Sequence, residues 1–248
     1  MIRFTLRALG LWMLLSIFGE RLDAAGERVS EIRPTALSFQ SGGREIRADY
    51  FAPAGPKSKR TVIVLHGAGG TLFDGPAMRR VARSLAEAGD SVYVLHYFNR
   101  TGTIGARDSD MQKHFGEWLQ TLRDGIVWVH GREKNGPIGI YGYSLGGFLS
   151  LAAGSDNSLV GAVAEQAGGV WNSQEKRIGK MPPVLMVHGL QDTRVPFEKY
   201  AKPLQQLLRE RGGKVETDFV QGQGHVFSEE AMKEVRPKVV SFFARKLR

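Results

Sequence analysis

The sequence predicts an α/β domain in which a mostly parallel sheet of eight strands carries helices on both faces. Short, continuous apolar runs such as Thr61–Leu65 and Val184–His188 are typical of strands that are buried on both faces. Longer segments with apolar residues at helical spacing, such as Asp110–Gly131, alternate with these runs. Strands that alternate with helices form parallel sheets, because each helix returns the chain across one face.

The elements follow in a simple order along the chain. A hairpin is expected first, because Thr35–Gln40 and Glu45–Ala52 are strand-like and Ser41-Gly42-Gly43 separates them. Pro76 in a first turn and Gly212-Gly213 as a stop mark the ends of two helices. Further strands are expected at 61–65, 91–97, 137–141, 159–165, 184–188 and 214–220, and helices at 74–88, 110–131, 147–153, 197–211 and 229–247.

The composition limits the classes of protein to consider. A chain of 248 residues fits one α/β domain, and 42% apolar residues are enough for a core. Cysteine is absent, which excludes disulfides, cysteine metal ligands and a cysteine nucleophile. The net charge is +9, but Lys and Arg are spread among Asp and Glu in helix-like segments. This favours solvated helix faces over a nucleic-acid-binding surface.

The first 25 residues have the features of a signal peptide. Arg3 and Arg7 precede an apolar run, Ala8–Phe18, and small residues at 24–26 offer a cleavage site. The run is shorter than the ~20 residues that a spanning helix needs. We therefore expect a signal peptide at 1–25, a linker at 26–34 and the domain at 35–248, in a periplasmic or secreted protein with no membrane span after cleavage. An uncleaved N-terminal anchor is the alternative.

The pentapeptide Gly142-Tyr143-Ser144-Leu145-Gly146 lies between an expected strand and an expected helix. A serine between two glycines at such a turn is typical of a nucleophile elbow, because side chains at the glycine positions would clash. Ser144 is therefore the candidate nucleophile.

A serine hydroxyl needs a general base, and an imidazole base needs an acid to fix its tautomer. Of the six histidines, only His225 lies in a glycine-flanked loop after the last expected strand. Asp192 lies in a polar turn just beyond another strand, whereas the rival acids Glu165 and Asp156 are expected to end a strand and to cap a helix. The order Ser144, Asp192, His225 is the order of an α/β-hydrolase triad.

A glycine-rich turn, His66-Gly67-Ala68-Gly69-Gly70, follows the strand 61–65. Backbone N–H groups that approach a substrate closely can stabilise an oxyanion. The expected donors are the N–H groups of Leu145 and Ala68, or of Gly67 or Gly69 if the turn differs. A plain structural turn is the alternative, and a phosphate loop is disfavoured because no Lys-Ser/Thr follows the glycines.

These motifs resemble the α/β-hydrolase superfamily and, within it, the dienelactone hydrolase group. The group resemblance is carried by the Gly42-Gly43 hairpin that leads to Ala52-Pro53, by His66-Gly67, and by His188-Gly189…Asp192…Val195-Pro196. It covers residues 35–247. Dienelactone hydrolases proper use a cysteine nucleophile, so Ser144 makes the chain similar to their serine esterase relatives.

The surroundings of the site are less strongly predicted. About 16 residues separate the strands that end near Ala167 and begin at Val184, which leaves no room for a large cap domain. The loop 98–109 is expected over the site. Candidate substrate contacts are Arg100, Arg107 and Arg194 for a carboxylate, Trp171 as a wall, and His66 and Tyr143 beside the two turns. Trp118 and Trp128 are expected in the core.

The sequence thus predicts an exported serine hydrolase that cleaves small carboxylic esters through an acyl-enzyme. No metal or organic cofactor and no nucleic-acid partner is expected, and the oligomeric state is left open. A peptidase, thioesterase or lactonase with the same triad is the alternative. A non-catalytic binding protein of this fold is disfavoured, because every triad position is filled.

Overall fold

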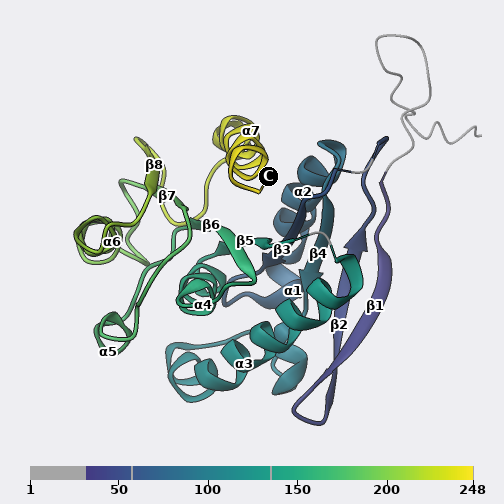
Figure 1. Ribbon diagram of the computed structural model, residues 1–248. Helices are drawn as coiled ribbons and strands as arrows, with labels where there is room; N and C mark the ends of the chain where they lie inside the picture. Colours follow the sequence, from purple (N-terminus) through teal and green to yellow (C-terminus); the bar gives the residue numbers. More distant parts are fainter. Residues whose placement is uncertain (1–31, 57, 135, 248) are drawn as a thin grey trace, which may run out of the picture. The chain divides into compact units, whose positions relative to one another are not determined.

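The computed structural model describes residues 32–56, 58–134 and 136–247 (Figure 1). The expected signal peptide, and residues 26–31 of the expected linker, lie outside the described residues.

One eight-stranded sheet organises the domain, with the strand order β1-β2-β4-β3-β5-β6-β7-β8. The pairs β1·β2 and β2·β4 are antiparallel, and all the other neighbouring pairs are parallel. The prediction of a mostly parallel, eight-stranded α/β-hydrolase sheet is therefore confirmed. The strands are β1 (Thr35–Ser41), β2 (Arg44–Phe51), β3 (Thr61–Leu65), β4 (Ser91–Leu95), β5 (Ile138–Tyr143), β6 (Val160–Gln166), β7 (Val184–Gly189) and β8 (Val215–Val220).

Helices cover both faces of the sheet, as Figure 1 shows. On one face, α2 (Gly75–Glu87) and α7 (Glu229–Lys246) pack on side chains that include Val62 and Val64. On the other, α3 (Asp108–Glu133), α4 (Leu145–Gly154) and α6 (Ala201–Glu210) pack on a second cluster, which includes Ile63 and Leu65. Alternate residues of β3 thus enter different cores, and all five residues of the strand are buried.

Three short helices were not predicted: α1 (Gly70–Phe73), the 3-10 helix η1 (Tyr97–Arg100) and α5 (Asn172–Glu175). One predicted boundary also differs in a way that affects the site. The helix expected from residue 197 begins only at Ala201, after a turn in which the N–H groups of Lys199 and Tyr200 both donate to the carbonyl of Pro196. The resulting turn carries Lys199 and Tyr200 to the cavity described below.

Only a short segment with α5 connects β6 to β7, so the domain has no large cap. The carboxyl ends of β3, β5, β7 and β8 lie along one rim of the sheet, where the predicted functional residues follow them. Among the residues described, no helix is both long and apolar enough to cross a membrane.

Candidate active site

Ser144 lies at the tight turn between β5 and α4, in a conformation that L-amino acids rarely adopt (φ 53°, ψ −118°). The flanking glycines make this turn possible. A Cβ atom at Gly142 would lie 2.1 Å from the carbonyl oxygen of Gly146, and one at Gly146 would lie 2.6 Å from that of His66. Both obstacles are backbone atoms, which cannot rotate away. The sequence therefore holds the hydroxyl of Ser144 above the sheet at the cost of backbone strain.

Ser144, His225 and Asp192 form one continuous hydrogen-bonded series. His225 Nε2 lies 2.9 Å from Ser144 Oγ, and His225 Nδ1 lies 2.8 Å from Asp192 Oδ2. The three side chains come from the ends of β5, β8 and β7. The loops that follow β7 and β8 are joined by a hydrogen bond, in which the Gln191 N–H donates to the carbonyl of Gln223 at 2.9 Å.

The carboxylate of Asp192 is buried and held by the turn that carries it. Its Oδ1 accepts the N–H groups of Arg194 and Val195, both at 2.8 Å. Burial raises the pKa of Asp192, but the hydrogen bond from His225 and these N–H groups outweigh it, and the net pKa is lowered. Asp192 is therefore ionised at neutral pH and accepts a hydrogen bond from His225 Nδ1–H, which leaves Nε2 free to accept the hydrogen bond from the Ser144 hydroxyl.

A second histidine supports this turn from below. His188 is buried, and burial lowers its pKa, so the ring is neutral. Its Nε2–H donates to the carbonyl of Val195 at 2.8 Å. The His188-Gly189…Val195 pattern of the sequence therefore has a structural role beside Asp192.

Ala68 and Leu145 both line the cavity above Ser144. Within the described part of the chain, neither backbone N–H donates to a protein acceptor. Leu145 opens α4, so its N–H also belongs to the positive end of that helix. Both residues thus bring an N–H group without a protein acceptor to the cavity that Ser144 lines, which is what the predicted oxyanion hole requires.

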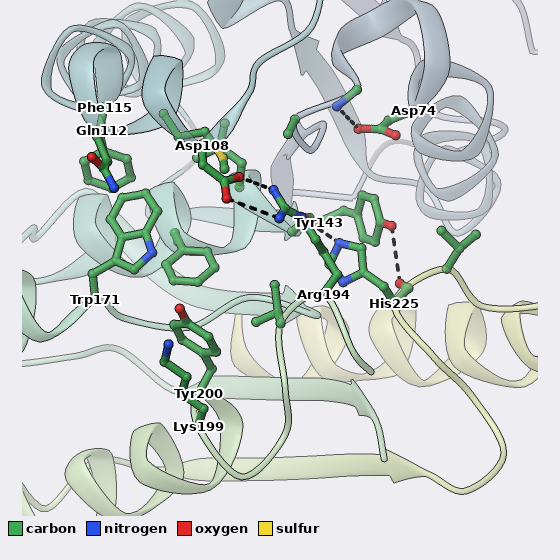
Figure 2. A pocket seen from close by; sticks show the side chains of 18 of the residues that line it. Asp74, Asp108, Gln112, Phe115, Tyr143, Trp171, Arg194, Lys199, Tyr200 and His225 are labelled. Atoms are coloured by element: carbon green, nitrogen blue, oxygen red, sulfur yellow. Dashed lines mark hydrogen bonds and ion pairs between the residues drawn. The ribbon is translucent and has the colours of Figure 1, made fainter. Parts of the chain in front are cut away.

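Asp74, at the start of the helix expected at 74–88, was not among the predicted site residues. Its side chain makes no cap hydrogen bond, and instead its Oδ2 accepts the Gly69 N–H at 3.0 Å (Figure 2). A Cβ at Gly69 would lie 2.6 Å from Asp74 Oδ1. Burial raises the pKa of Asp74. This carboxyl group lines the cavity and fixes the glycine-rich turn that carries Ala68.

The two rival acids lie away from His225. Glu165 is buried beneath the start of α4, where its Oε2 accepts the Gly168 N–H at 2.8 Å and burial raises its pKa to about 8. Asp156, beyond the end of α4, accepts the Lys180 N–H at 2.8 Å. Neither carboxyl group makes a hydrogen bond or an ion pair with His225.

A cavity of about 930 Å³ opens above Ser144, and its wall is aromatic at one end. Trp171 packs against Phe148 and Phe115, both with ring centroids 4.8 Å away, and Tyr200 meets Phe148 edge-on at 5.7 Å. Figure 2 shows Phe115, Trp171 and Tyr200 on one side and His225, Tyr143 and Asp74 on the other. Trp171 and Tyr143 thus line the cavity as predicted, and the Tyr143 hydroxyl donates to the backbone carbonyl of His225 at 3.3 Å. Phe115, Phe148 and Tyr200 were not foreseen.

Arg194 also lines the cavity, but it has a partner there. Both terminal nitrogens of its guanidinium group contact the carboxylate of Asp108, at the start of α3. In Figure 2 this ion pair lies between the aromatic side chains and His225. Arg194 therefore does not offer an unpaired cation to a substrate carboxylate.

The structure places Arg100 and His66, both predicted as substrate contacts, away from the cavity. Arg100 turns toward the hairpin, donates to the carbonyl of Ser41 at 2.7 Å and pairs with Glu117. His66 is fully buried, stacks on Tyr97 at 4.1 Å and is neutral, because burial lowers its pKa to about 3. Neither residue lines the cavity, and neither does Arg107.

The loop 98–109 is placed differently from the expectation as well. Its residues 104–106 lie against the glycine-rich turn, where the Ala106 N–H donates to the carbonyl of Ala68 at 2.8 Å. Of this loop, only Asp108 reaches the cavity.

The aromatic end of the cavity is separated from a second cavity by a thin partition. Trp171, Phe115 and Phe148 also bound a void of about 10 Å³, and Gln174 lines this void and both larger cavities. The second cavity, of about 610 Å³, is polar and lies near the end of α4, with Arg123 and Arg177 in its wall.

Comparison with known proteins places this geometry in a family. The profile of the dienelactone hydrolase family matches residues 46–242. The chain belongs to the dienelactone hydrolase family. The resemblance carried by the motifs is thus confirmed, and the protein is a hydrolase of that family. No curated protein matches the chain.

Solved structures confirm the fold at low sequence identity. An alpha-beta serine hydrolase homologue from Coxiella burnetii is 20% identical, with a TM-score of 0.68 over 86% of this chain and 98% of that one. A dienelactone hydrolase from Anabaena variabilis is 19% identical, with a TM-score of 0.68 over 88% of this chain and all of that one. An acylaminoacyl peptidase from Pyrococcus horikoshii is 18% identical, with a TM-score of 0.67, and the match covers 88% of this chain but 42% of the peptidase.

Groups of three or more His, Asp or Glu side chains placed to hold a metal ion are absent from the described ranges.

Proposed function

We propose that this member of the dienelactone hydrolase family is a serine hydrolase that cleaves carboxylic esters. The observation that carries the proposal is the unbroken hydrogen-bond series from Ser144 through His225 to Asp192, with distances of 2.9 Å and 2.8 Å. Where dienelactone hydrolases proper use a cysteine, this chain places a serine at the elbow and has no cysteine at all. The nucleophile must then be activated by a base rather than by its own acidity.

The geometry suggests the following sequence of steps. Ser144 Oγ attacks the acyl carbon while His225 Nε2 takes its proton, and the carboxylate of Asp192 stabilises the imidazolium. The N–H groups of Leu145 and Ala68 hold the oxyanion. His225 then gives its proton to the leaving alcohol, and an acyl group remains on Ser144. Water then attacks the acyl carbon while His225 Nε2 takes its proton. The bond from the acyl carbon to Ser144 Oγ breaks, His225 returns the proton to Oγ, and the carboxylic acid leaves.

A fluorophosphonate probe tests the nucleophile directly. The probe should label the purified protein once per chain, and digestion should place the label on the peptide that contains Ser144. Ser144→Ala is the control and should remain unlabelled. Absence of label in the natural protein, or label that persists in the variant, would overturn the mechanism.

The bond that is cleaved is tested separately. Esters should be hydrolysed faster than thioesters, lactones or peptide amides with the same acyl group. One of the solved structures with this fold is a peptidase, so the amide is the most important comparison. Labelling at Ser144 together with a preference for amides would keep the triad and replace the esterase by a peptidase.

We also propose that the protein is exported and that the signal peptide is removed near residues 24–26, on the sequence features of this segment. Determination of the N-terminus in a native extract tests this. A mature chain that begins at Met1 would contradict cleavage.

A further inference from the structure

We propose that the aromatic end of the cavity is an acyl-binding subsite that selects uncharged, flat acyl groups, namely aryl or aryl-alkanoyl esters. The inference rests on the proposed esterase function and extends it to a substrate class.

The position of His225 determines the direction in which the acyl substituent of a bound ester points. In the tetrahedral intermediate, the leaving oxygen must lie within reach of the proton on His225 Nε2. The oxyanion takes the place near the N–H groups of Leu145 and Ala68. The acyl substituent is left to point away from His225, toward the opposite end of the cavity. That end is formed by Phe115, Phe148, Trp171 and Tyr200, as Figure 2 shows for the three that it labels.

The rings form a preorganised surface. Phe115 on α3 and Phe148 on α4 are both buried, at 6% exposure, and Trp171 contacts both rings. Tyr200 closes the same end, held by the turn at Pro196. Rigid rings lose little conformational entropy when a ligand binds, and they favour an aromatic guest in stacked or edge-on contact.

The charges at this end favour an uncharged guest. Arg194 is paired with Asp108, and the pair crosses the cavity beside the rings. The remaining cation, Lys199, lies at the edge with its Nζ 5.3 Å from the centre of the Tyr200 ring and is exposed. A carboxylate placed against these rings would lose part of its hydration, and the arginine and lysine that line the cavity offer little in return, because Arg194 is already paired with Asp108 and Lys199 is exposed to solvent.

The test compares esters that share the p-nitrophenol leaving group and differ in the acyl group. We expect kcat/KM for the 3-phenylpropanoate to exceed that for the acetate by about 10- to 100-fold, the effect expected for burial of one aromatic ring. It should also exceed that for the 3-cyclohexylpropanoate, which is as apolar but not flat. A 4-carboxyphenylpropanoate should lose the advantage.

The variant Trp171→Leu should lower the phenylpropanoate-to-acetate ratio by about tenfold. Trp128→Leu is the matched control: Trp128 stacks on Phe39 at 5.1 Å and does not line the cavity. It should leave the ratio unchanged. The ratio serves as the measure because it does not depend on how much folded enzyme each preparation contains.

Two results would overturn the subsite. One is a natural enzyme that prefers the acetate or the cyclohexyl ester, and the other is a ratio that Trp171→Leu does not change. Either result, obtained with an enzyme that hydrolyses esters and is labelled at Ser144, removes the subsite and leaves the proposed function intact. Loss of all ester hydrolysis and of labelling would instead remove the proposed function.

Discussion

At the scale of single residues, the backbone conformation of Ser144 lowers the stability of the fold by an amount that can be measured. Its φ of 53° with a ψ of −118° is a combination that glycine adopts readily and serine does not. Such conformations cost on the order of 1–3 kcal/mol each and are kept where function requires them.

We therefore expect Ser144→Gly to be more stable to urea than Ser144→Ala by about 1 kcal/mol, although both lack the hydroxyl. Ser84, within α2, supplies the control, since Ser84→Gly should lose stability relative to Ser84→Ala in an ordinary helical conformation. Equal urea midpoints for the two Ser144 variants would show that the strain is not stored there.

The role proposed for Asp192 gives a second prediction at this scale. Asp192→Asn keeps the shape of the side chain but offers no carboxylate to His225 Nδ1, so the imidazole is no longer held in the required tautomer. We expect kcat for an ester to fall by about 10³- to 10⁴-fold with little change in KM. Glu165→Gln, at the rival acid, should retain most of its kcat. The reverse result would move the acid to Glu165.

At the scale of elements, the junction of β5 and α4 depends on the absence of two side chains. A Cβ at Gly142 would lie 2.1 Å from the carbonyl oxygen of Gly146, whereas a Cβ at Gly116, on the exposed side of α3, meets no atom of the described chain within 4 Å. The same substitution, glycine to alanine, is therefore expected to have opposite effects on stability at the two positions.

Gly142→Ala should displace the elbow, lower the stability by at least about 2 kcal/mol and reduce kcat by about 10²-fold or more. Gly116→Ala should raise the stability by about 0.5–1 kcal/mol, because alanine is the better helix former, and should leave kcat unchanged. Urea denaturation and ester kinetics on both variants give the answer. A Gly142→Ala enzyme of full activity would contradict the described turn.

The elements that the sequence predicted well are those with a strong period or a continuous apolar run. β3, which is buried on both faces, was bounded correctly to the residue, and every expected strand is present. The short helices α1 and α5 have four residues each, which is too few to show a helical period. The order of Ser144, Asp192 and His225 along the chain, and their positions at strand ends, were enough to predict that these residues contact one another.

The walls of the cavity could not be predicted in the same way. Phe115 has the spacing of a core residue, and only tertiary packing turns one edge of it toward the cavity. Arg100 was assigned to the site because its loop follows a strand end, but its position is decided by the carbonyl of Ser41, 59 residues earlier. Long-range hydrogen bonds of this kind leave no local trace in a sequence.

At the scale of the whole molecule, the buried Glu165 links the folding free energy to pH. Burial raises its pKa from 4.5 to about 8. Between these values the folded chain retains a proton that the unfolded chain releases, so stability falls as pH rises from about 4.5 to 8 and is lowest above that range.

We expect Glu165→Gln to remove this dependence. At each pH, the free energy of unfolding of the variant is compared with that of the natural protein. The difference in favour of the variant should be larger at pH 9 than at pH 5, by on the order of 1–4 kcal/mol. Urea midpoints at the two pH values measure the difference. Glu234→Gln, at an exposed position of α7, should follow the natural protein. If the urea midpoints of all three proteins change by the same amount between pH 5 and pH 9, Glu165 is ionised in the folded state.

The partition between the two cavities bears on how the specificity of this protein could change over evolution. Trp171 and Gln174 belong to the connection that contains α5, not to the sheet or to the helices that carry Ser144, Asp192 and His225. Gln174 lines both the cavity of about 930 Å³ and the one of about 610 Å³, and Trp171 lines the first of them and the small void beside it. Smaller residues at these two positions would thin the partition beside the proposed acyl subsite. A lineage can thus alter that subsite through a surface connection, with no change in the residues that form the triad.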